Sequence, residues 1–423
     1  MSGQKFSRSS CQVPAMALLF VAVLMLAATT LANAQTETLI HVFQSTNLLD
    51  GAVPLANLVA DSRGALYGTT PEGGKHGFGS VYKLVPPATH GAPWKEDILY
   101  SFTGGADGGN PWVGGLLLTK SGLIYGTART GGSSNSGVVY QLTPGQPWSE
   151  TVLYSFTDGK GGGLPSSGVI LDSKGALYGM TFHGGVNNQG VVYRLSPPSK
   201  SGTRTETVLH AFKGGASDGY LPLFGLTFDS TGALYGATEA GGPDDSGCVF
   251  KLTPGTGGWT ESILYFFNGG TDAGGPNSGV VFDSTGALYG STAGNGVQNG
   301  NIYQLTPSGG GAWTENILHA FTGSPNDGAV PNGVIIDSTG ALYGTTSFGG
   351  AFDTCCNGAG TIFSLSPPLT QGGSWTEQIV YSFQGGSDGK GPDVPLLLLD
   401  GTFYGVTNNG GKPNLGTVFS FTP

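Results

Sequence analysis

The sequence predicts an all-β fold, a seven-bladed β-propeller with four antiparallel strands in each blade. Three observations support this prediction. A repeat returns seven times, each copy holds four short strand-forming runs, and the two ends of the chain supply complementary strands. Glycine accounts for 77 of 423 residues, well above the usual ~7%, and this suits short strands joined by tight turns. After the N-terminal segment, no stretch has the apolar period of an amphipathic helix.

The repeat is clearest in the stretch from Gly168 to Thr181, GVILDSKGALYGMT. An apolar run, an Asp-x-x-Gly turn and a second β-prone run predict a hairpin, because the aspartate accepts backbone hydrogen bonds and the glycine supplies a positive φ. Seven copies fill residues 35–423. The tyrosine of a Leu-Tyr-Gly motif, with Ile or Phe in place of Leu in the second and seventh copies, marks each copy at Tyr67, Tyr125, Tyr178, Tyr235, Tyr289, Tyr343 and Tyr404.

Each copy contains four strand-like runs, here termed strands A to D. In the second copy they are Val113–Leu118, Leu123–Thr127, Val138–Leu142 and Thr151–Phe156. Short runs separated by Gly, Pro, Asn and Asp are typical of propeller blades. The mature chain begins with a D-type strand at 36–43 and ends with a C-type strand at 416–421. We therefore expect the first strand to complete the last blade and close the ring, with an open solenoid as the alternative.

A ring of such blades places the D-to-A and B-to-C connections on one face and the A-to-B and C-to-D connections on the other. The D-to-A loops carry a repeated Asp-Gly, and the B-to-C loops carry a repeated Thr-x-x-Gly-Gly. Propellers usually bind ligands on this face, so the ligand is expected there.

The N-terminus predicts export. Lys5 and Arg8 precede an uncharged apolar run from Met16 to Ala28, and Ala32-Asn33-Ala34 follows, the pattern of a signal peptide over residues 1–34. The apolar run is shorter than the ~20 residues of a membrane-spanning helix, which makes an uncleaved anchor the weaker alternative. The mature chain, residues 35–423, is expected to be a monomer without a membrane span.

Composition excludes some partners. The mature chain keeps 15 basic and 27 acidic residues, a net charge of −12, which argues against nucleic acid. Cys11 leaves with the signal peptide, and the remaining Cys248, Cys355 and Cys356 predict no disulfide framework. Their redox state stays open.

Residues found in every blade are expected to be structural, and residues that differ between blades are expected to line an axial site. By this rule Trp112, the tryptophan outside strand D, is the best aromatic ligand contact. The Trp-x-Glu that opens strand D is interpreted as structural, with the indole covering the blade rim and the glutamate pairing across the strand. A multivalent carbohydrate surface is the alternative for these tryptophans.

Acidic residues on the ligand face are further ligand candidates. They are the D-to-A aspartates Asp107, Asp218, Asp327 and Asp388 and the non-repeated Glu72, Glu239, Asp244, Asp245, Asp353 and Asp393. Their oxygens suit calcium, but no Asp-x-Asp-x-Asp loop is present. No cofactor is therefore predicted, and calcium is the metal that these residues would take.

Two histidines, His76 and His183, lie in B-to-C loops and are the catalytic candidates. His41, His210 and His319 replace tyrosines of strand D and are interpreted as structural. The sequence contains no His-Glu-x-x-His, P-loop or dinucleotide motif. We favour a non-catalytic binding or scaffold module for a glycan or protein, and a secreted lyase or hydrolase with an axial, calcium-dependent site is the alternative.

The pattern G-x-LYG-T-x-x-GG, G-x-V[YF]-x-L-x-P and W-x-E-x-[IVL]-L-Y-x-F covers nearly all of residues 36–423 in seven copies. It resembles the family of choice-of-anchor tandem repeat GloVer-containing proteins. The resemblance implies a bacterial envelope or exported protein of uncharacterised activity, often with a C-terminal sorting signal. This chain stops at Pro423 directly after the last strand, which favours a periplasmic or released protein.

Overall fold

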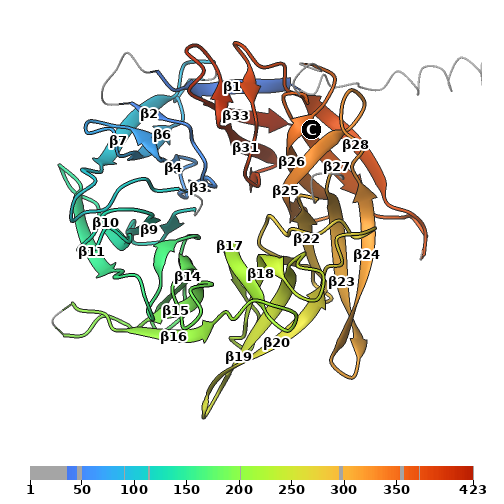
Figure 1. Cartoon of the computed structure of the whole chain (residues 1–423). Coiled ribbons are helices and arrows are strands. Elements are labelled where there is room, and N and C mark those ends of the chain that lie inside the picture. Colours follow the sequence, from blue (N-terminus) through green and yellow to red (C-terminus); the bar gives the residue numbers. More distant parts are fainter. Residues whose placement is uncertain are drawn as a thin grey trace, which may run out of the picture.

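The computed structural model describes residues 36–44, 50–89, 91–112, 115–200, 202–294, 299–352, 357–370 and 372–422. The predicted signal peptide at 1–34 lies outside the described residues, as do Asp353, Cys355 and Cys356. Every element in the described part of the chain is a β-strand. Seven small antiparallel sheets surround a common axis (Figure 1), which confirms the predicted propeller.

Each blade runs outward from strand A to strand D in the order expected from the repeat. The first blade contains β3 (Val59–Ala60), β4 (Leu66–Thr70), β6 (Ser80–Val85) and β7 (Lys95–Ser101). The second contains β8 (Leu117–Leu118), β9 (Ile124–Ala128), β10 (Val138–Thr143) and β11 (Ser149–Ser155). In the third, β12 (Gly163–Pro165) and β13 (Ile170–Leu171) both pair with β14 (Leu177–His183), followed by β15 (Val191–Leu195) and β16 (Glu206–Ala211).

The remaining blades follow the same plan. The fourth contains β17 (Gly219–Phe228), β18 (Leu234–Gly241), β19 (Cys248–Gly255) and β20 (Gly258–Phe266). The fifth contains β21 (Val281–Phe282), β22 (Leu288–Thr292), β23 (Asn301–Gly309) and β24 (Ala312–Ala320). The sixth contains β25 (Gly328–Ile336), β26 (Leu342–Gly349), β27 (Thr361–Ser366) and β28 (Thr376–Ser382). The seventh contains β30 (Leu397–Leu399), β31 (Thr402–Thr407), β33 (Thr417–Thr422) and β1 (Thr36–Val42).

The first strand closes the ring, as predicted. β1 pairs antiparallel with β33, with a register shift between Leu39 and His41. The N–H of Phe43 then donates to the carbonyl of Gly416 at 3.1 Å. This pairing covers the outer edge of β33 and joins the two ends of the described chain.

Most strand boundaries in the second blade match the prediction within two residues. Strand A is described only in part: β8 spans Leu117–Leu118, and Val113 and Gly114 of the predicted strand lie outside the described residues. Pro111 has no N–H for a ladder bond, and a Cβ on Gly115 would lie 3.3 Å from the Cβ of Asn57 in the first blade. The described part of this strand thus lies close to the first blade.

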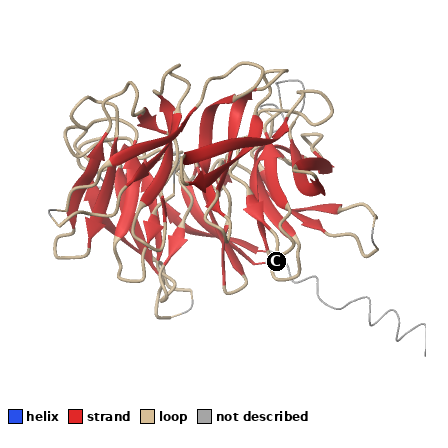
Figure 2. Cartoon of the chain, turned by 90° about the horizontal axis from the view of Figure 1, so that it is seen from below, coloured by secondary structure: helices blue, strands red, loops and turns tan. Residues whose placement is uncertain are grey.

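Short pairings place the D-to-A and B-to-C loops on one face. β2 (Gly51–Ala52) in a D-to-A loop pairs with β5 (Glu72–Gly73) in a B-to-C loop, and β29 (Gly389–Lys390) pairs likewise with β32 (Asn409–Gly410). The close approach explains the repeated Gly-Gly. Gly73 has a φ of +74°, and a Cβ there would lie 2.6 Å from the carbonyl oxygen of Asp50. The A-to-B hairpins end on the opposite face, and Figure 2 shows loops at both ends of the strands.

The hydrophobic core lies at the junctions between blades. Phe102 at the end of strand D packs edge-on against Tyr140 of the next blade, with ring centroids 5.1 Å apart. Both rings are fully buried. The glycine of Leu-Tyr-Gly makes room for this tyrosine, since a Cβ on Gly126 would lie 2.4 Å from the Tyr140 hydroxyl. Apolar residues on both faces of each strand are therefore used in packing.

The strand D tryptophans also belong to these junctions. Trp94, Trp259 and Trp375 contact the Leu-Tyr-Gly tyrosine of the preceding blade edge-on, with ring centroids 6.1–6.2 Å apart. In the third blade Arg204 takes the place of tryptophan and lies over Tyr125 at 5.9 Å. Their repeated role is to pack neighbouring blades together.

If the ring is closed, Phe43 should contribute as much to the free energy of unfolding as Phe102, which occupies the same position at the junction of the first and second blades. Phe43 is fully buried and packs edge-on against Tyr82 at 5.3 Å, as Phe102 packs against Tyr140. Phe43→Ala and Phe102→Ala should each lower the free energy of unfolding by about 3–5 kcal/mol. Denaturant titration measures this. A Phe43→Ala loss near zero beside a large Phe102→Ala loss would show that the first strand is not docked.

Candidate functional site

The repeated D-to-A aspartates hold their own loops. Asp107 accepts hydrogen bonds from the N–H of Thr103 at 2.8 Å and from the hydroxyl of Tyr100 at 3.0 Å. Asp388 accepts equivalent bonds from Gln384 and Tyr381. Asp218 and Asp327 accept backbone bonds on both carboxylate oxygens, and both are buried. The structure keeps these four residues in separate blades.

The glutamate of Trp-x-Glu approaches the aspartate of the preceding blade rather than pairing across its own strand. At the junction of the fourth and fifth blades, the hydroxyl of Tyr265 lies 3.1 Å from both the Asp272 Oδ2 and the Glu315 Oε2. A tyrosine fills this position at four junctions. At the other three, histidine replaces it, in the clusters His41–Asp50–Glu96, His210–Asp218–Glu261 and His319–Asp327–Glu377.

Burial raises the pKa of these glutamates. At the tyrosine junctions, desolvation and then the nearby Asp107 raise the pKa of Glu150 to about 7. Desolvation and Asp272 raise the pKa of Glu315 likewise, to about 7. A protonated glutamate can face an ionised aspartate without charge repulsion. The carboxyl pairs are thus part of the contact between blades.

The remaining sequence candidates lie apart from one another. His76, Glu72 and Asp244 are exposed in B-to-C loops. Asp245 braces its loop by accepting the Gly241 N–H at 3.1 Å. Among the described residues, the histidines within ion-pair distance of a carboxylate are His41, His210 and His319. His183 instead contacts Phe182, with ring centroids 5.2 Å apart.

Two positions of the repeat face the axis and change from blade to blade. The first follows the proline of the D-to-A loop, and the second lies four residues after the Leu-Tyr-Gly tyrosine. The two positions contact each other within a blade, as Trp112 contacts Arg129 and Asn332 contacts Ser347. Eight residues that line two adjacent cavities are here termed the axial mouth: Trp112, Arg129, Ser166, Phe182, Leu223, Asn277, Asn332 and Asp393.

One side of the axial mouth is aromatic and cationic. The Arg129 guanidinium lies 4.3 Å from the ring centroid of Trp112 and 5.5 Å from that of Phe182. These residues line a cavity of about 150 Å³ together with Ser166 and Leu223. Trp112 is 42% exposed. Arg129 is half-buried, and burial lowers its pKa, yet an arginine stays charged at neutral pH.

The other side of the axial mouth is polar. The Asn332 side-chain amide donates to the Ser347 hydroxyl at 3.0 Å and to the Pro392 carbonyl at 2.7 Å. The Asn408 amide donates to the Asp393 carboxylate. Burial raises the pKa of Asp393 to about 6. A narrow cavity of about 30 Å³ separates these groups from the first and second blades.

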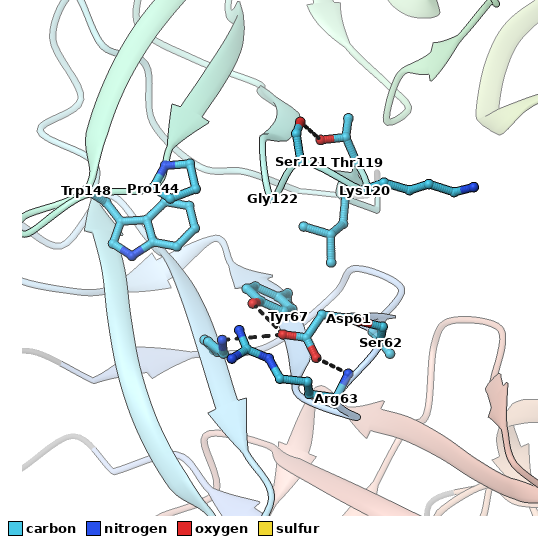
Figure 3. Close-up of a pocket in the computed structure, with 13 residues that line it drawn as sticks. Asp61, Ser62, Arg63, Tyr67, Thr119, Lys120, Ser121, Gly122, Pro144 and Trp148 are labelled. Atoms are coloured by element: carbon cyan, nitrogen blue, oxygen red, sulfur yellow. Dashed lines mark hydrogen bonds and ion pairs between the residues drawn. The ribbon is translucent and has the colours of Figure 1, made fainter.

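A larger pocket of about 740 Å³ lies between the hairpins of the first two blades, on the face with the A-to-B connections (Figure 3). Its polar groups are already used by the repeat. Asp61 accepts hydrogen bonds from the Arg63 N–H and the Tyr67 hydroxyl, and Asp172 and Asp229 accept equivalent bonds in other blades. The pocket therefore follows from blade packing.

The protein is thus a β-propeller with two kinds of polar site. One is the cluster of Asp, Glu and Tyr or His side chains that recurs at the blade junctions, and the other is the axial mouth, which does not repeat. The sequence matches the Gloeobacter/Verrucomicrobia repeat over residues 28–244 and 224–423. The chain belongs to this family. No curated protein matches it.

Solved structures of other proteins show limited similarity. A putative oxidoreductase (glucose dehydrogenase) from Thermus thermophilus is 19% identical, with 74% of this chain and 94% of that chain covered and a TM-score of 0.43. A putative gluconolactonase is 14% identical, with coverage of 69% and 85% and a TM-score of 0.35. A gluconolactonase from Xanthomonas campestris is 15% identical, with coverage of 72% and 90% and a TM-score of 0.36. At these values the similarities say nothing about the chemistry of this chain.

The described part of the chain has no helix with the length and apolarity to cross a membrane.

Sequence reasoning identified Trp112 but missed Arg129 and Phe182. Both occupy an aligned position where every blade has a different residue. Comparing the copies position by position would have found them. Arg129 contacts Trp112 within the second blade, whereas its contact with Phe182 depends on how the second and third blades meet at the axis and could not be read from the sequence.

The raised glutamate pKa predicts a pH-dependent stability. Between pH 4.5 and about 7 the folded protein keeps the Glu150 proton that the unfolded chain releases, so stability falls as pH rises through this window. Glu150→Gln should leave stability unchanged near pH 4.5 and raise it by roughly 1–2 kcal/mol at pH 8, after allowance for solvent screening. Denaturant titrations at both pH values measure this.

The exposed Glu72→Gln serves as the control and should not change the pH dependence of stability. A Glu150→Gln protein that loses stability equally at both pH values would contradict the proton-sharing interpretation.

Proposed function

We propose that this protein is an exported, monomeric, non-catalytic binding module that recognises an acidic glycan at the axial mouth. The observation that supports the proposal most directly is the Arg129 guanidinium held between Trp112 and Phe182. No ion pair joins Arg129 to a carboxylate among the described residues. A free, half-buried cation on an acidic protein suits an anionic ligand.

The chemistry of the axial mouth fits a sugar acid. A guanidinium can form two parallel hydrogen bonds with a carboxylate. The partly exposed Trp112 offers an aromatic surface for a sugar ring. The Asn277 amide on the opposite side and the Ser166 hydroxyl beside Arg129 can exchange hydrogen bonds with sugar hydroxyls. A protein ligand would engage a broader surface than this small recess.

The alternative, a lyase or hydrolase, has weaker support. Its best candidates, His76 and His183, do not line either cavity of the axial mouth. The described histidine–carboxylate pairs lie instead at blade junctions. Export to the periplasm or the outside of the cell is proposed from the N-terminal pattern and would bring the protein to envelope glycans.

A glycan array screened with and without calcium tests the proposal. We expect binding to glycans with uronic or other sugar acids, weakening at high salt because charge contributes, and little response to neutral glycans. Trp112→Ala and Arg129→Gln should each weaken binding about tenfold or more, since each removes about 1.4 kcal/mol or more of contact energy. Titration calorimetry with an array hit measures the affinity.

Phe352→Ala is the matched control, because Phe352 is 44% exposed in a B-to-C loop of another blade. This variant should bind as the wild type does. Binding to acidic glycans that survives both Trp112→Ala and Arg129→Gln, or no glycan binding at all, would refute the proposal.

A further inference from the structure

The three histidine junctions differ chemically from the four tyrosine junctions. Tyrosine at this position donates its hydroxyl to the neighbouring carboxylates, as Tyr100 does to Asp107 at 3.0 Å. Histidine brings a nitrogen with a lone pair to the same place. Each histidine cluster therefore presents one imidazole and two carboxylates, one of them from the next blade.

The distances within these clusters suit one shared ion. The Nε2 of His210 lies 3.4 Å from the Asp218 Oδ2 and 3.3 Å from the Glu261 Oε1. The Nε2 of His41 lies 3.6 Å from an oxygen of each of its two carboxylate partners. In all three clusters the ligand atoms lie within 4.8 Å of one another. Zinc bonds of about 2.0–2.2 Å in tetrahedral geometry place ligand atoms about 3.3–3.5 Å apart.

In two of the clusters the Nε2 atom, of His41 or His210, is buried without a hydrogen-bond partner. The glutamate Oε1 is unpartnered at every junction, Glu96 and Glu261 included. Buried polar atoms are normally satisfied, and a cation between them would satisfy nitrogen and oxygen together. The side chains are 13% exposed at His210, 3% at Asp218 and 16% at Glu261.

The donor set selects a class of metal. Calcium and magnesium take oxygen ligands almost entirely, whereas imidazole nitrogen suits zinc and its transition-metal neighbours. The two carboxylates together balance the charge of a divalent ion. This composition favours a transition metal over the calcium considered from sequence.

We propose that the clusters His41–Asp50–Glu96, His210–Asp218–Glu261 and His319–Asp327–Glu377 each bind one divalent transition-metal ion of the zinc class. Each ion joins strand D of one blade to strand D of the next: β1 to β7, β16 to β20 and β24 to β28. The first of these links lies beside the closure of the ring. The role is structural, because all protein ligands lie at blade junctions and away from the axial mouth.

The rival explanation is that histidine replaces tyrosine only as a hydrogen-bond donor. His319 fits this explanation as well, since its Nε2 lies 3.1 Å from the Asp327 Oδ2. The two explanations differ in what they predict for metal uptake. The repeat itself supplies the test, because tyrosine occupies this position naturally in the other four blades.

The purified protein is stripped with a chelator and titrated with zinc by calorimetry, and bound metal is counted by elemental analysis. We expect three ions per chain. His41→Tyr, His210→Tyr and His319→Tyr should each remove one, and the triple variant should bind none. Cobalt should give the visible absorption of a tetrahedral site, and calcium should not compete.

Two further variants separate metal binding from folding. Glu261→Gln keeps the shape of the side chain and should weaken zinc binding at its cluster at least tenfold. His183→Tyr, outside the clusters, should keep three ions. Zinc should raise the thermal midpoint of the wild type but not of the triple variant. No zinc uptake by the stripped wild type, or uptake unchanged in the triple variant, would overturn the proposal.

Discussion

Burial between neighbouring blades is the constraint on which the structure depends. Each strand carries apolar side chains on both faces, so a blade is stable only with a partner on either side. Phe102, Tyr140 and Tyr67 illustrate this, because they pack in one core shared by two blades. In an open array of such blades, the first and the last blade would each leave an apolar face exposed to water. The pairing of β1 with β33 completes the fourth strand of the seventh blade, so the first and seventh blades pack on each other as the other neighbours do.

This constraint divides the residues into two groups. Repeated positions are committed to junctions: the aspartate holds the D-to-A loop, the glutamate meets it from the next blade, and the tryptophan packs on a tyrosine. The two positions of each blade that face the axis take no part in these junctions, and their residues vary from blade to blade. A protein with seven nearly equal blades thereby builds one asymmetric site, with Arg129 and Trp112 on one side and Asn332 and Asp393 on the other. The first group carries the repeat pattern through which the chain belongs to its family.

The junction network also has chemistry of its own. Pairs of carboxyl groups recur between blades, and either a tyrosine or a histidine completes each cluster. With tyrosine, burial raises the pKa of the glutamate, which favours the protonated form beside the aspartate. With histidine, the same position gains a metal-ligating nitrogen. A single substitution within the repeat thus changes a hydrogen-bonded contact into a candidate metal link without altering the packing around it.

The sequence by itself determined the class of fold, the number of blades, the strand order and the closure, since each follows from local hydrophobic pattern and turn chemistry repeated seven times. It also singled out Trp112. Only the tertiary structure decided which residues meet across blades. The approach of Arg129 to Phe182, and of Glu261 to His210, joins positions far apart in the chain. Local propensity carries no information about such contacts, because they depend on the angle and spacing at which closed blades pack.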